Sequence, residues 1–447
     1  MTDPITVLGA GPAGLAAGFY AQRRDFDVRL YEAADAVGGN ARTLQFGPFR
    51  YDTGAHRFHD KNPRVTADVR ALLGDDDLHR VDAPSQILWR GRRVGFPPAP
   101  GDLARALPLR LLARVAFEQL SLRLRPHAPP RHFEQMARRR YGPTLARLFL
   151  LDYTEKLWGA PPSRLSPDVA GSRLDGLDLK TFVLDALGAD RRKARHLDGS
   201  FLYPTRGYGL IAEATADAIG RERIRTGARI TQLAHANDEG RIRRVEINGA
   251  ERVPVGPLVS TLPLTRVLRL LEPAPPAAVQ SAAQSVRFRH LRLAVLGLPE
   301  RARVSPNASL YFSQPDVPFT RLYEPKNRSA RMAPSGQTVV VMELPCDPGS
   351  DPWRMDAGKL RRLARRTLVD HDLIADDETT VFTSHPVPFA YPVLECGTDR
   401  KARRLRRYLN RFENLHLLGR SARFTYTHVH DLYAQARRLM DELASNS

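Results

Sequence analysis

The first forty residues alternate between short strand-like runs and a glycine-rich stretch. Ile5–Leu8 and Val28–Tyr31 have the length and the apolar, β-branched composition of short strands. Between them, a glycine turn at 9–14 leads into a helical composition that continues to about Arg24. Strand, turn, helix and strand in this order predict a βαβ unit at the beginning of the chain.

The pattern becomes helical from residue 101 to about 190. Five apolar positions recur on one helix face, namely Leu109, Leu112, Ala113, Ala116 and Leu120. The arginines between them are also compatible with a helix that lies on a membrane surface. We expect instead that this face packs against the rest of the protein, because prolines end the segment in an ordinary loop between helices.

Strand patterns return in the second half of the chain. Residues 224–261 contain short β-type runs, and 286–388 form a strand-rich segment punctuated by proline. A last strand at 415–418 precedes Gly419 and a terminal helix. The chain therefore reads as an α/β fold with two insertions.

The expected domains follow from these changes of pattern. A discontinuous nucleotide-binding domain is predicted from 1–100, 196–285 and 389–447. A helical insertion, 101–195, and an antiparallel β-sheet insertion, 286–388, interrupt it and are expected to hold the substrate.

Gly9, Gly11 and Gly14 fit the GxGxxG pattern of dinucleotide-binding proteins. The pattern follows a predicted strand and opens a predicted helix, and Glu32 stands at the end of the next strand. Gly9 permits the tight turn, Gly11 lets the backbone approach a pyrophosphate, and Gly14 lets helix and strand pack closely. The helix N-terminus attracts the pyrophosphate, and Glu32 is suited to accept hydrogen bonds from ribose hydroxyls.

A second glycine cluster favours FAD over NAD as the bound dinucleotide. Gly38-Gly39-Asn40-Ala41-Arg42 follows Glu32 closely, as in the FAD fold of the glutathione-reductase type. The Gly419-Arg420 pair, which leads into the last helix, suits the C-terminal segment that contacts FAD in that fold. The sequence therefore predicts a Rossmann-like FAD-binding domain, with NAD as the less favoured alternative.

Composition and charge narrow the class of protein without deciding it. The 447 residues exceed what one hydrophobic core usually supports, so two or three sub-domains are expected. The net charge of +19 fits either an arginine-rich surface or an anionic substrate, because guanidinium groups bind phosphate and carboxylate bidentately. We expect no nucleic-acid partner, because no recognised nucleic-acid-binding motif is present.

Membrane insertion is not expected either. No uncharged apolar run reaches transmembrane length. Asp3 and several glycines argue against a signal peptide at Ile5–Ala21, so we expect a cytoplasmic protein. Peripheral contact with a membrane and the oligomeric state stay open.

Metal and disulfide chemistry are not indicated. Cys346 and Cys396 stand in no metal-binding or redox spacing and are expected to be reduced thiols. His428, His430 and Asp431 lie close together, but no further ligand cluster accompanies them, so no metal is expected.

Five segments of the chain resemble UDP-galactopyranose mutases, within the superfamily of amine oxidases and protoporphyrinogen oxidases. In chain order they are Gly38–Ala41 with Asp52–His59, Tyr153–Gly159, Pro318–Lys326, Ala390–Val393, and Gly419-Arg420 with Tyr426. The resemblance extends from about residue 5 to residue 440. It implies a FAD-binding domain, a helical bundle and a six-stranded antiparallel sheet.

The resemblance also implies a pyranose–furanose isomerisation of a nucleotide-activated sugar without net redox change. N5 of the reduced flavin attacks the anomeric carbon, displaces the nucleoside diphosphate and forms a covalent flavin–sugar adduct. The adduct opens to an iminium and recloses through a different hydroxyl before the nucleotide returns. The flavin has to be kept reduced, and NAD(P)H is a candidate external reductant.

The resemblance assigns roles to individual residues. Arg173, Arg321 and Arg420 would clamp the diphosphate. Tyr153, Tyr391 and Tyr426 would donate hydrogen bonds to phosphate oxygens, Trp158 would form an apolar wall, and His56 and His59 would lie beside N5. His56, His59, Arg321 and Arg420 are thus the catalytic candidates. The residues assigned to FAD are Gly9, Gly11, Pro12, Ala13, Gly14, Glu32, Ala33, Gly39, Asn40, Ala41, Gly54, Ala55, His56, Arg229, Ile230, Gly419, Arg420, Val429 and His430.

Other interpretations remain. Tyr153 and Trp158 fit a hydrophobic core equally well, and Arg173 fits a surface ion pair. The mutases carry an acidic pair around the position after Tyr426, where this chain has Thr427-His428-Val429-His430-Asp431, and the Gly207-Tyr208-Gly209 region also differs from their nucleotide-contacting segment. A FAD-dependent oxidoreductase of the amine-oxidase or protoporphyrinogen-oxidase type is therefore the alternative function. A flavin-binding protein without catalysis is a third.

Overall fold

The first layer of the molecule is a parallel sheet. The computed structural model describes residues 3–96, 98–122, 129–174, 200–236, 240–302, 304–376 and 381–445, with the backbone alone at 171–174. The parallel sheet has five strands, which lie in the order β20–β13–β1–β2–β9 and all pair in parallel. They are β1 (Ile5–Leu8), β2 (Val28–Tyr31), β9 (Ile224–Arg225), β13 (Leu258–Ser260) and β20 (Leu415–Leu417). The predicted βαβ opening is confirmed, and the sheet draws on three separate parts of the chain.

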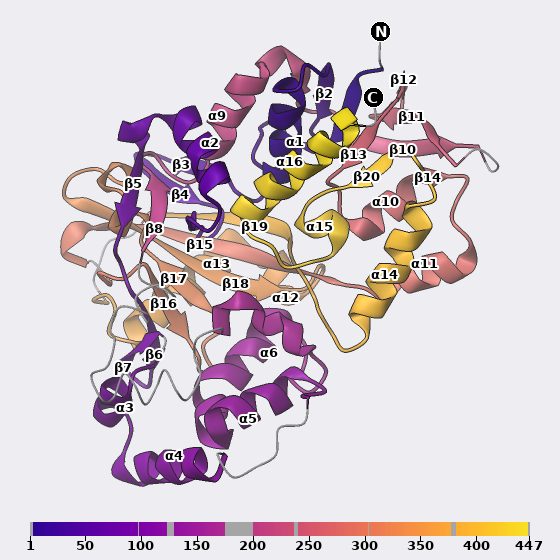
Figure 1. The fold of residues 1–447 in the computed structure, drawn as a ribbon. Helices are drawn as coiled ribbons and strands as arrows, with labels where there is room; N and C mark the ends of the chain where they lie inside the picture. Colours follow the sequence, from indigo (N-terminus) through magenta and orange to yellow (C-terminus); the bar gives the residue numbers. More distant parts are fainter. Residues whose placement is uncertain are drawn as a thin grey trace.

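Helix α1 (Pro12–Gln22) is the centre of this layer. It is buried along nearly its whole length, which its many alanines and glycines permit by keeping its surface small. It packs on α9 (Leu210–Ile219) and on the C-terminal helix α16 (Val429–Ser445), which lies beside it in Figure 1. The beginning and the end of the chain thus share one core.

A smaller sheet lies next to the parallel one. It contains β10 (Ile230–His235), β11 (Ile242–Ile247), β12 (Glu251–Pro254) and β14 (Leu271–Glu272). Helices α10 (Leu264–Leu270), α11 (Ala277–Gln284) and α14 (Thr398–Leu409) close a second hydrophobic core around it.

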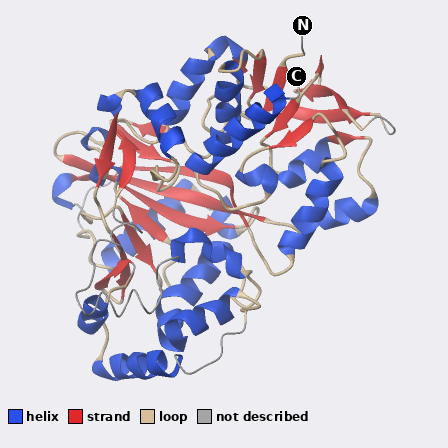
Figure 2. Cartoon of the chain, viewed as in Figure 1, coloured by secondary structure: helices blue, strands red, loops and turns tan. Residues whose placement is uncertain are grey.

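A seven-stranded sheet crosses the middle of the molecule (Figures 1 and 2). Its order is β19 (Val381–Pro392), β15 (Phe288–Pro299), β18 (Gln337–Cys346), β17 (Arg321–Tyr323), β16 (Ser309–Phe312), β6 (Ser85–Trp89) and β7 (Arg92–Phe96). All neighbours are antiparallel except β16 and β6. The antiparallel sheet is confirmed, but the expectation of six strands is wrong: residues 288–392 supply five strands, and the hairpin 85–96 adds two more at the far edge.

The remaining elements surround these sheets. One short hairpin joins β3 (Thr43–Phe46) to β4 (Phe49–Asp52), and β5 (Leu78–Val81) pairs with β8 (Phe201–Pro204). The further helices are α2 (Pro63–Leu73), α3 (Pro100–Ala106), α4 (Leu109–Leu122), α5 (Phe133–Leu145), α6 (Asp152–Trp158), α12 (Asp351–Arg354), α13 (Ala357–Asp370) and α15 (Arg420–Arg423). A π-helical stretch, η2 (Ala146–Leu151), joins α5 to α6, and a 3-10 helix, η3 (Pro167–Leu174), follows. None of the helices in the described ranges is long and apolar enough to span a membrane.

Helix α4 corrects one prediction. The helix is present, but four of the five residues expected to pack on the protein, Leu109, Ala113, Ala116 and Leu120, are exposed, whereas Leu112 does pack against a hydrophobic cluster. The inner side of α4 carries the buried Val115, the partly buried Leu111 and Leu112, and the side chains of Glu118 and Gln119, which bond to α5. Apolar periodicity predicted the helix correctly, but it does not determine which side faces the neighbouring helix when polar anchors hold the other side.

Candidate functional site

A cavity of about 540 Å³ lies where the parallel sheet, the seven-stranded sheet and the helical segment meet. We call two parts of its lining the glycine wall (Gly9, Gly11, Gly39 and Gly419) and the aromatic wall (Tyr153, Trp158, Tyr311, Tyr391 and Tyr426). Aliphatic and phenylalanine side chains continue the aromatic wall, among them Ile87, Phe96, Phe133, Phe149, Leu157, Leu291 and Val387.

The glycine wall is built from backbone that comes too close for side chains. A Cβ at Gly14 would lie 1.8 Å from the carbonyl oxygen of Gly9, so α1 begins directly against the end of β1. Gly9 has a φ of +97°, which glycine adopts without steric strain. A Cβ at Gly39 would lie 3.1 Å from the Cα of Gly11, so the two glycine turns meet and leave a surface of bare backbone.

The charges beside this wall suit a dinucleotide. Helix α1 begins at Pro12 without a side-chain cap, so the positive end of its dipole faces the cavity lining at Ala13. The Glu32 carboxylate accepts hydrogen bonds from the backbone nitrogens of Ala10, at 2.7 Å, and Ala34, at 2.9 Å. It is thereby fixed in the cavity lining at the end of β2. These residues fit the predicted FAD, since a pyrophosphate needs the bare backbone and a ribose needs the fixed carboxylate.

The loop after β4 places His56 and His59 in the same lining. The Nε2 atom of His56 lies 2.8 Å from the carbonyl oxygen of Asn40, and its ring packs on Tyr208 at 5.0 Å. Burial, reinforced by nearby arginines, lowers the pKa of His56 to about 3. Burial together with Arg57 and other cations lowers the pKa of His59 to about 4. Both rings are therefore neutral at physiological pH.

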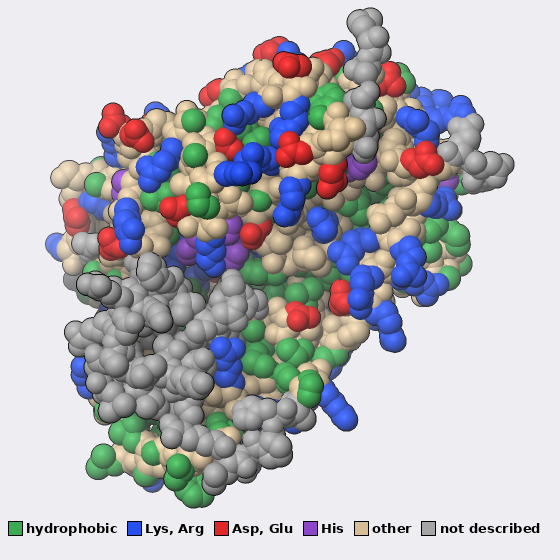
Figure 3. Space-filling model, in the orientation of Figure 1, with side chains coloured by type: hydrophobic (Ala, Val, Ile, Leu, Met, Phe, Trp, Pro, Cys, Tyr) green, Lys and Arg blue, Asp and Glu red, His purple; other side chains and the backbone are tan. Residues whose placement is uncertain are grey.

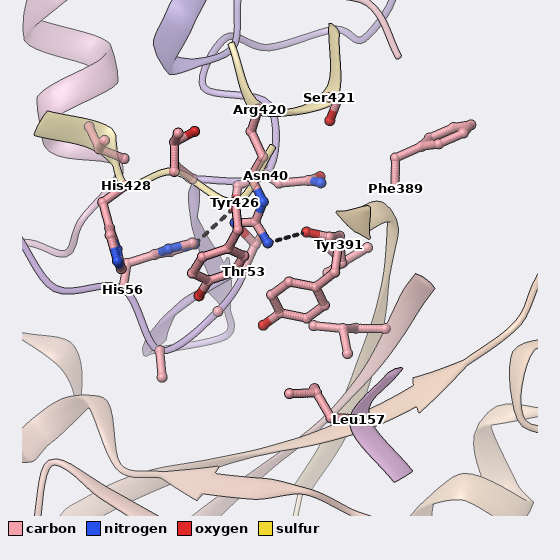
Figure 4. Close-up of a pocket in the computed structure, with 18 of the residues that line it drawn as sticks. Asn40, Thr53, His56, Leu157, Phe389, Tyr391, Arg420, Ser421, Tyr426 and His428 are labelled. Atoms are coloured by element: carbon pink, nitrogen blue, oxygen red, sulfur yellow. Dashed lines mark hydrogen bonds between the residues drawn. The ribbon is translucent and has the colours of Figure 1, made fainter. Parts of the chain in front are cut away.

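Arg420 connects the two walls. It follows Gly419 at the start of α15, and its guanidinium carbon lies 4.7 Å from the ring centre of Tyr391 and 4.6 Å from that of Tyr426. Its Nη2 atom donates to the carbonyl oxygen of Ala390 at 2.6 Å (Figure 4). A cation between two aromatic faces is attracted by both ring quadrupoles and is held in place.

The aromatic wall joins residues from distant parts of the chain. The rings of Tyr391 and Tyr426 are stacked at 6.2 Å, and Trp158 from α6 lies 5.8 Å from the first and 6.4 Å from the second. In the view of Figure 4 the phenol oxygens of Tyr391 and Tyr426 point in the same general direction. Tyr153 meets Tyr311 of β16 at 5.9 Å. The wall thus combines apolar ring faces with several hydroxyl groups.

Arg321 lines the cavity but already has an internal partner. Its Nε and Nη2 atoms donate to the two carboxylate oxygens of Glu343 at 3.0 and 2.6 Å. Glu343 is almost fully buried and also accepts from the backbone nitrogen of Ala55 at 3.2 Å. The bidentate pair connects β17, β18 and the loop after β4. Arg321 therefore has a structural role in holding the site together, in addition to any charge that it presents to a ligand.

Several predicted flavin residues lie away from the cavity lining. Gly14 is enclosed in the turn, Ala33 and Arg229 are exposed, Ile230 belongs to a hydrophobic core, and His430 is buried behind the lining. All the other predicted residues except Arg173 do line the cavity. The side chain of Arg173 lies outside the described residues.

The lining also contains residues that the sequence analysis did not single out. Among them are Arg57, Lys61 and Tyr311, and the lining also includes Tyr208 from the Gly207-Tyr208-Gly209 region. Tyr311 is the half-buried position of β16, and the other three residues of this strand are buried. Within the described part of the chain, no group of three or more His, Cys, Asp or Glu side chains is arranged to hold a metal ion.

The parallel sheet, the glycine wall and the fixed Glu32 define a dinucleotide-binding flavoprotein. Residues 12–440 match the family described as flavin containing amine oxidoreductase. The chain belongs to this family, and membership implies FAD as the cofactor.

Individual relatives differ in what they catalyse. A chloroplastic protoporphyrinogen oxidase from Nicotiana tabacum is 28% identical over 169 residues, which cover 37% of this chain and only 30% of that protein. A zeta-carotene-forming phytoene desaturase from Myxococcus xanthus is 23% identical over 405 residues, or 80% of this chain and 75% of that protein. The crystal structure of a reduced UDP-galactopyranose mutase superposes with a TM-score of 0.85 at 20% identity, covering 100% of this chain and 95% of the other. At this identity the superposition establishes the fold alone.

Proposed function

We propose that this flavoenzyme isomerises a nucleotide-activated sugar between pyranose and furanose forms, in the manner of a UDP-galactopyranose mutase. The observation that carries the proposal is the group formed by Arg420, Tyr391 and Tyr426 on the cavity surface. A guanidinium beside two stacked phenol rings suits a diphosphate, because it offers positive charge and neutral donors together.

The protein's contribution to such a reaction is binding and orientation. When bound in its reduced form, the flavin would supply N5 as a nucleophile toward the anomeric carbon. Tyr391 and Tyr426 would donate their phenol hydrogens to phosphate oxygens of the leaving nucleotide. Arg420 would stabilise the negative charge that develops there, and Trp158 would support one face of the sugar or base. A diphosphate held in this way is kept in the cavity for its return.

Neutral histidines fit the same role. The lowered pKa keeps His56 uncharged, and its hydrogen bond to the carbonyl oxygen of Asn40 fixes the ring beside the glycine wall. A protonated imidazole at this place would compete with Arg420 for the diphosphate. The lowered pKa therefore leaves the binding of the diphosphate to the arginines of the lining rather than to His56.

Oxidation of a lipophilic small molecule is the second candidate. The wall beyond Trp158 is largely apolar, with Ile87, Phe96, Phe133 and Phe149 in the lining, and the bidentate pair with Glu343 engages Arg321. The relatives named as a protoporphyrinogen oxidase and a phytoene desaturase support this class. In this case the flavin would accept electrons from the substrate.

One experiment separates the two functions. Dithionite-reduced, FAD-loaded protein is incubated anaerobically with UDP-galactose and a panel of other sugar nucleotides, and products are resolved by chromatography and mass spectrometry. An isomer of unchanged mass that forms only with the reduced flavin supports the mutase function. The absence of any isomer, together with bleaching of the oxidised flavin by an apolar substrate, would replace it with the oxidase function.

A further inference from the structure

Helix α4 exposes an apolar face to solvent. Four large apolar side chains are markedly exposed in the described part of the molecule, and three of them, Leu109, Phe117 and Leu120, belong to this helix. They are 85%, 72% and 61% exposed. Their spacing places them on one side of the helix, with the exposed Ala113 and Ala116 between them. Figure 3 shows apolar side chains gathered at the lower edge, where α4 lies in Figure 1.

The helix is held so that this face stays outward. The side-chain amide of Gln119 donates to the carbonyl oxygen of Tyr141 at 2.6 Å. Glu118 accepts from both the backbone nitrogen and the hydroxyl of Thr144, at 2.8 and 2.7 Å. Rotating the apolar face inward would break these bonds and bury charge, so the outward orientation belongs to the stable fold.

The charge around this face is positive. The sequence from 100 to 145 contains nine arginines and three acidic residues. Each acid is paired with an arginine one helical turn away: Asp102 with Arg105, Glu118 with Arg114, and Glu134 with Arg138. Nine arginines and three acids give this stretch of sequence a formal net charge of +6. Arg110, itself exposed, stands on the helix next to Leu109.

We propose that α4 docks the protein on the surface of an anionic phospholipid bilayer. Helices that lie in the membrane interface carry Phe and Leu on one face and basic residues beside it, and they bury the apolar face at the boundary between headgroups and acyl chains. A second copy of this chain is a poorer occupant, because two surfaces with this excess of arginine would repel one another. The overall charge of +19 also draws the protein toward anionic lipid.

The position of α4 relates docking to the cavity. The inward Leu111 and Leu112 pack in one hydrophobic cluster with Ile87 and Phe149, and these two also line the cavity. One layer of side chains therefore separates the docking helix from the apolar part of the active-site wall. The inference does not depend on which reaction the enzyme catalyses.

Vesicle co-sedimentation of the FAD-loaded full-length protein tests the proposal. The vesicles are phosphatidylcholine alone, or phosphatidylcholine with about a third phosphatidylglycerol. We expect binding to the anionic vesicles and a loss of about tenfold or more in the variant Phe117→Gln/Leu120→Gln, because two exposed apolar groups no longer insert. Gln keeps the helix propensity of Leu, so the fold is expected to persist.

Val381→Gln is the matched control. Val381 is 49% exposed on β19, in a different part of the fold, and its replacement is expected to leave vesicle binding unchanged. Failure of the wild-type protein to bind anionic vesicles overturns the proposal. So does equal binding by the α4 variant. Light scattering adds a third outcome: a dimer that the α4 variant dissociates would make the face a contact between copies and would likewise contradict docking on lipid.

Discussion

The glycine wall and the aromatic wall border one cavity, but the chain builds them in opposite ways. The glycine wall comes mainly from two turns within the first forty residues, where the absence of side chains creates the surface. The aromatic wall brings Tyr153, Trp158, Tyr311, Tyr391 and Tyr426 together from four separate segments. Backbone geometry defines the first wall and tertiary packing defines the second.

This difference corresponds to what each wall has to bind. A pyrophosphate and a ribose are shared by all users of FAD, so a local arrangement of glycines and one carboxylate is sufficient. A substrate is particular to each enzyme, and the wall proposed to bind it draws on residues from distant parts of the chain. Solved structures with the same fold but different named activities, such as a UDP-galactopyranose mutase and a putrescine oxidase, fit this division.

Gly14→Ala is expected to have the largest effect. The new Cβ would lie 1.8 Å from the carbonyl oxygen of Gly9, so the backbone of the turn has to move. We predict a loss of more than about 5 kcal/mol in unfolding free energy and no retained flavin. FAD content per chain and thermal unfolding provide the measurement. Gly18→Ala in the same helix meets only the side-chain tips of Ile219 and Leu30 and should stay within about 1 kcal/mol of the wild type.

Glu343→Gln tests how the aromatic wall is held. It removes the charge that faces the buried Arg321, and the uncompensated guanidinium is expected to lower the unfolding free energy by about 3–5 kcal/mol. Urea unfolding of the FAD-loaded protein measures this. The double variant Arg321→Met/Glu343→Met should recover a large part of the loss. A neutral effect of the single variant would mean that the pair does not support the site.

Tyr391→Phe and Tyr426→Phe test whether the aromatic wall binds substrate independently of the glycine wall. Each change removes a hydroxyl that we assign to the diphosphate, and a hydrogen bond to a charged group contributes about 1.5–3 kcal/mol. We predict that kcat/KM for the sugar nucleotide falls about tenfold or more in each variant, while FAD content stays the same. Tyr408→Phe, on α14, is the control. Loss of flavin from either site variant would show that the two walls are not independent.

The last prediction concerns the dependence of stability on pH. The folded-state pKa values of about 3 for His56 and about 4 for His59 lie below the usual value, so the unfolded chain binds protons that the folded one does not. Stability should therefore fall as the pH decreases from about 6.5 toward 4. His59→Gln should flatten this part of the curve of unfolding temperature against pH. An unchanged slope would show that His59 does not contribute to it.

The sequence predicted the glycine wall better than the aromatic wall, for physical reasons. Strand, GxGxxG turn and helix are local, so Gly9 and Glu32 could be placed from spacing alone. The partnership of Arg321 with Glu343 depends on register between two strands, which spacing does not reveal. The outward face of α4 depends on Gln119 and Glu118, whose bonds form only after α5 has docked. Tyr311 was missed because a single tyrosine in a strand gives no sign of the cavity beside it.

A calorimetric titration of UDP tests the two-wall account most directly. UDP is added to FAD-loaded protein, to the Tyr391→Phe/Tyr426→Phe variant, and to protein stripped of flavin. The account predicts about one UDP per FAD-loaded chain, and binding weakened by about tenfold or more in the variant. If UDP bound the flavin-free protein but not the FAD-loaded protein, the two-wall account would be contradicted. The UDP would then occupy the glycine wall, and the aromatic wall would hold no diphosphate.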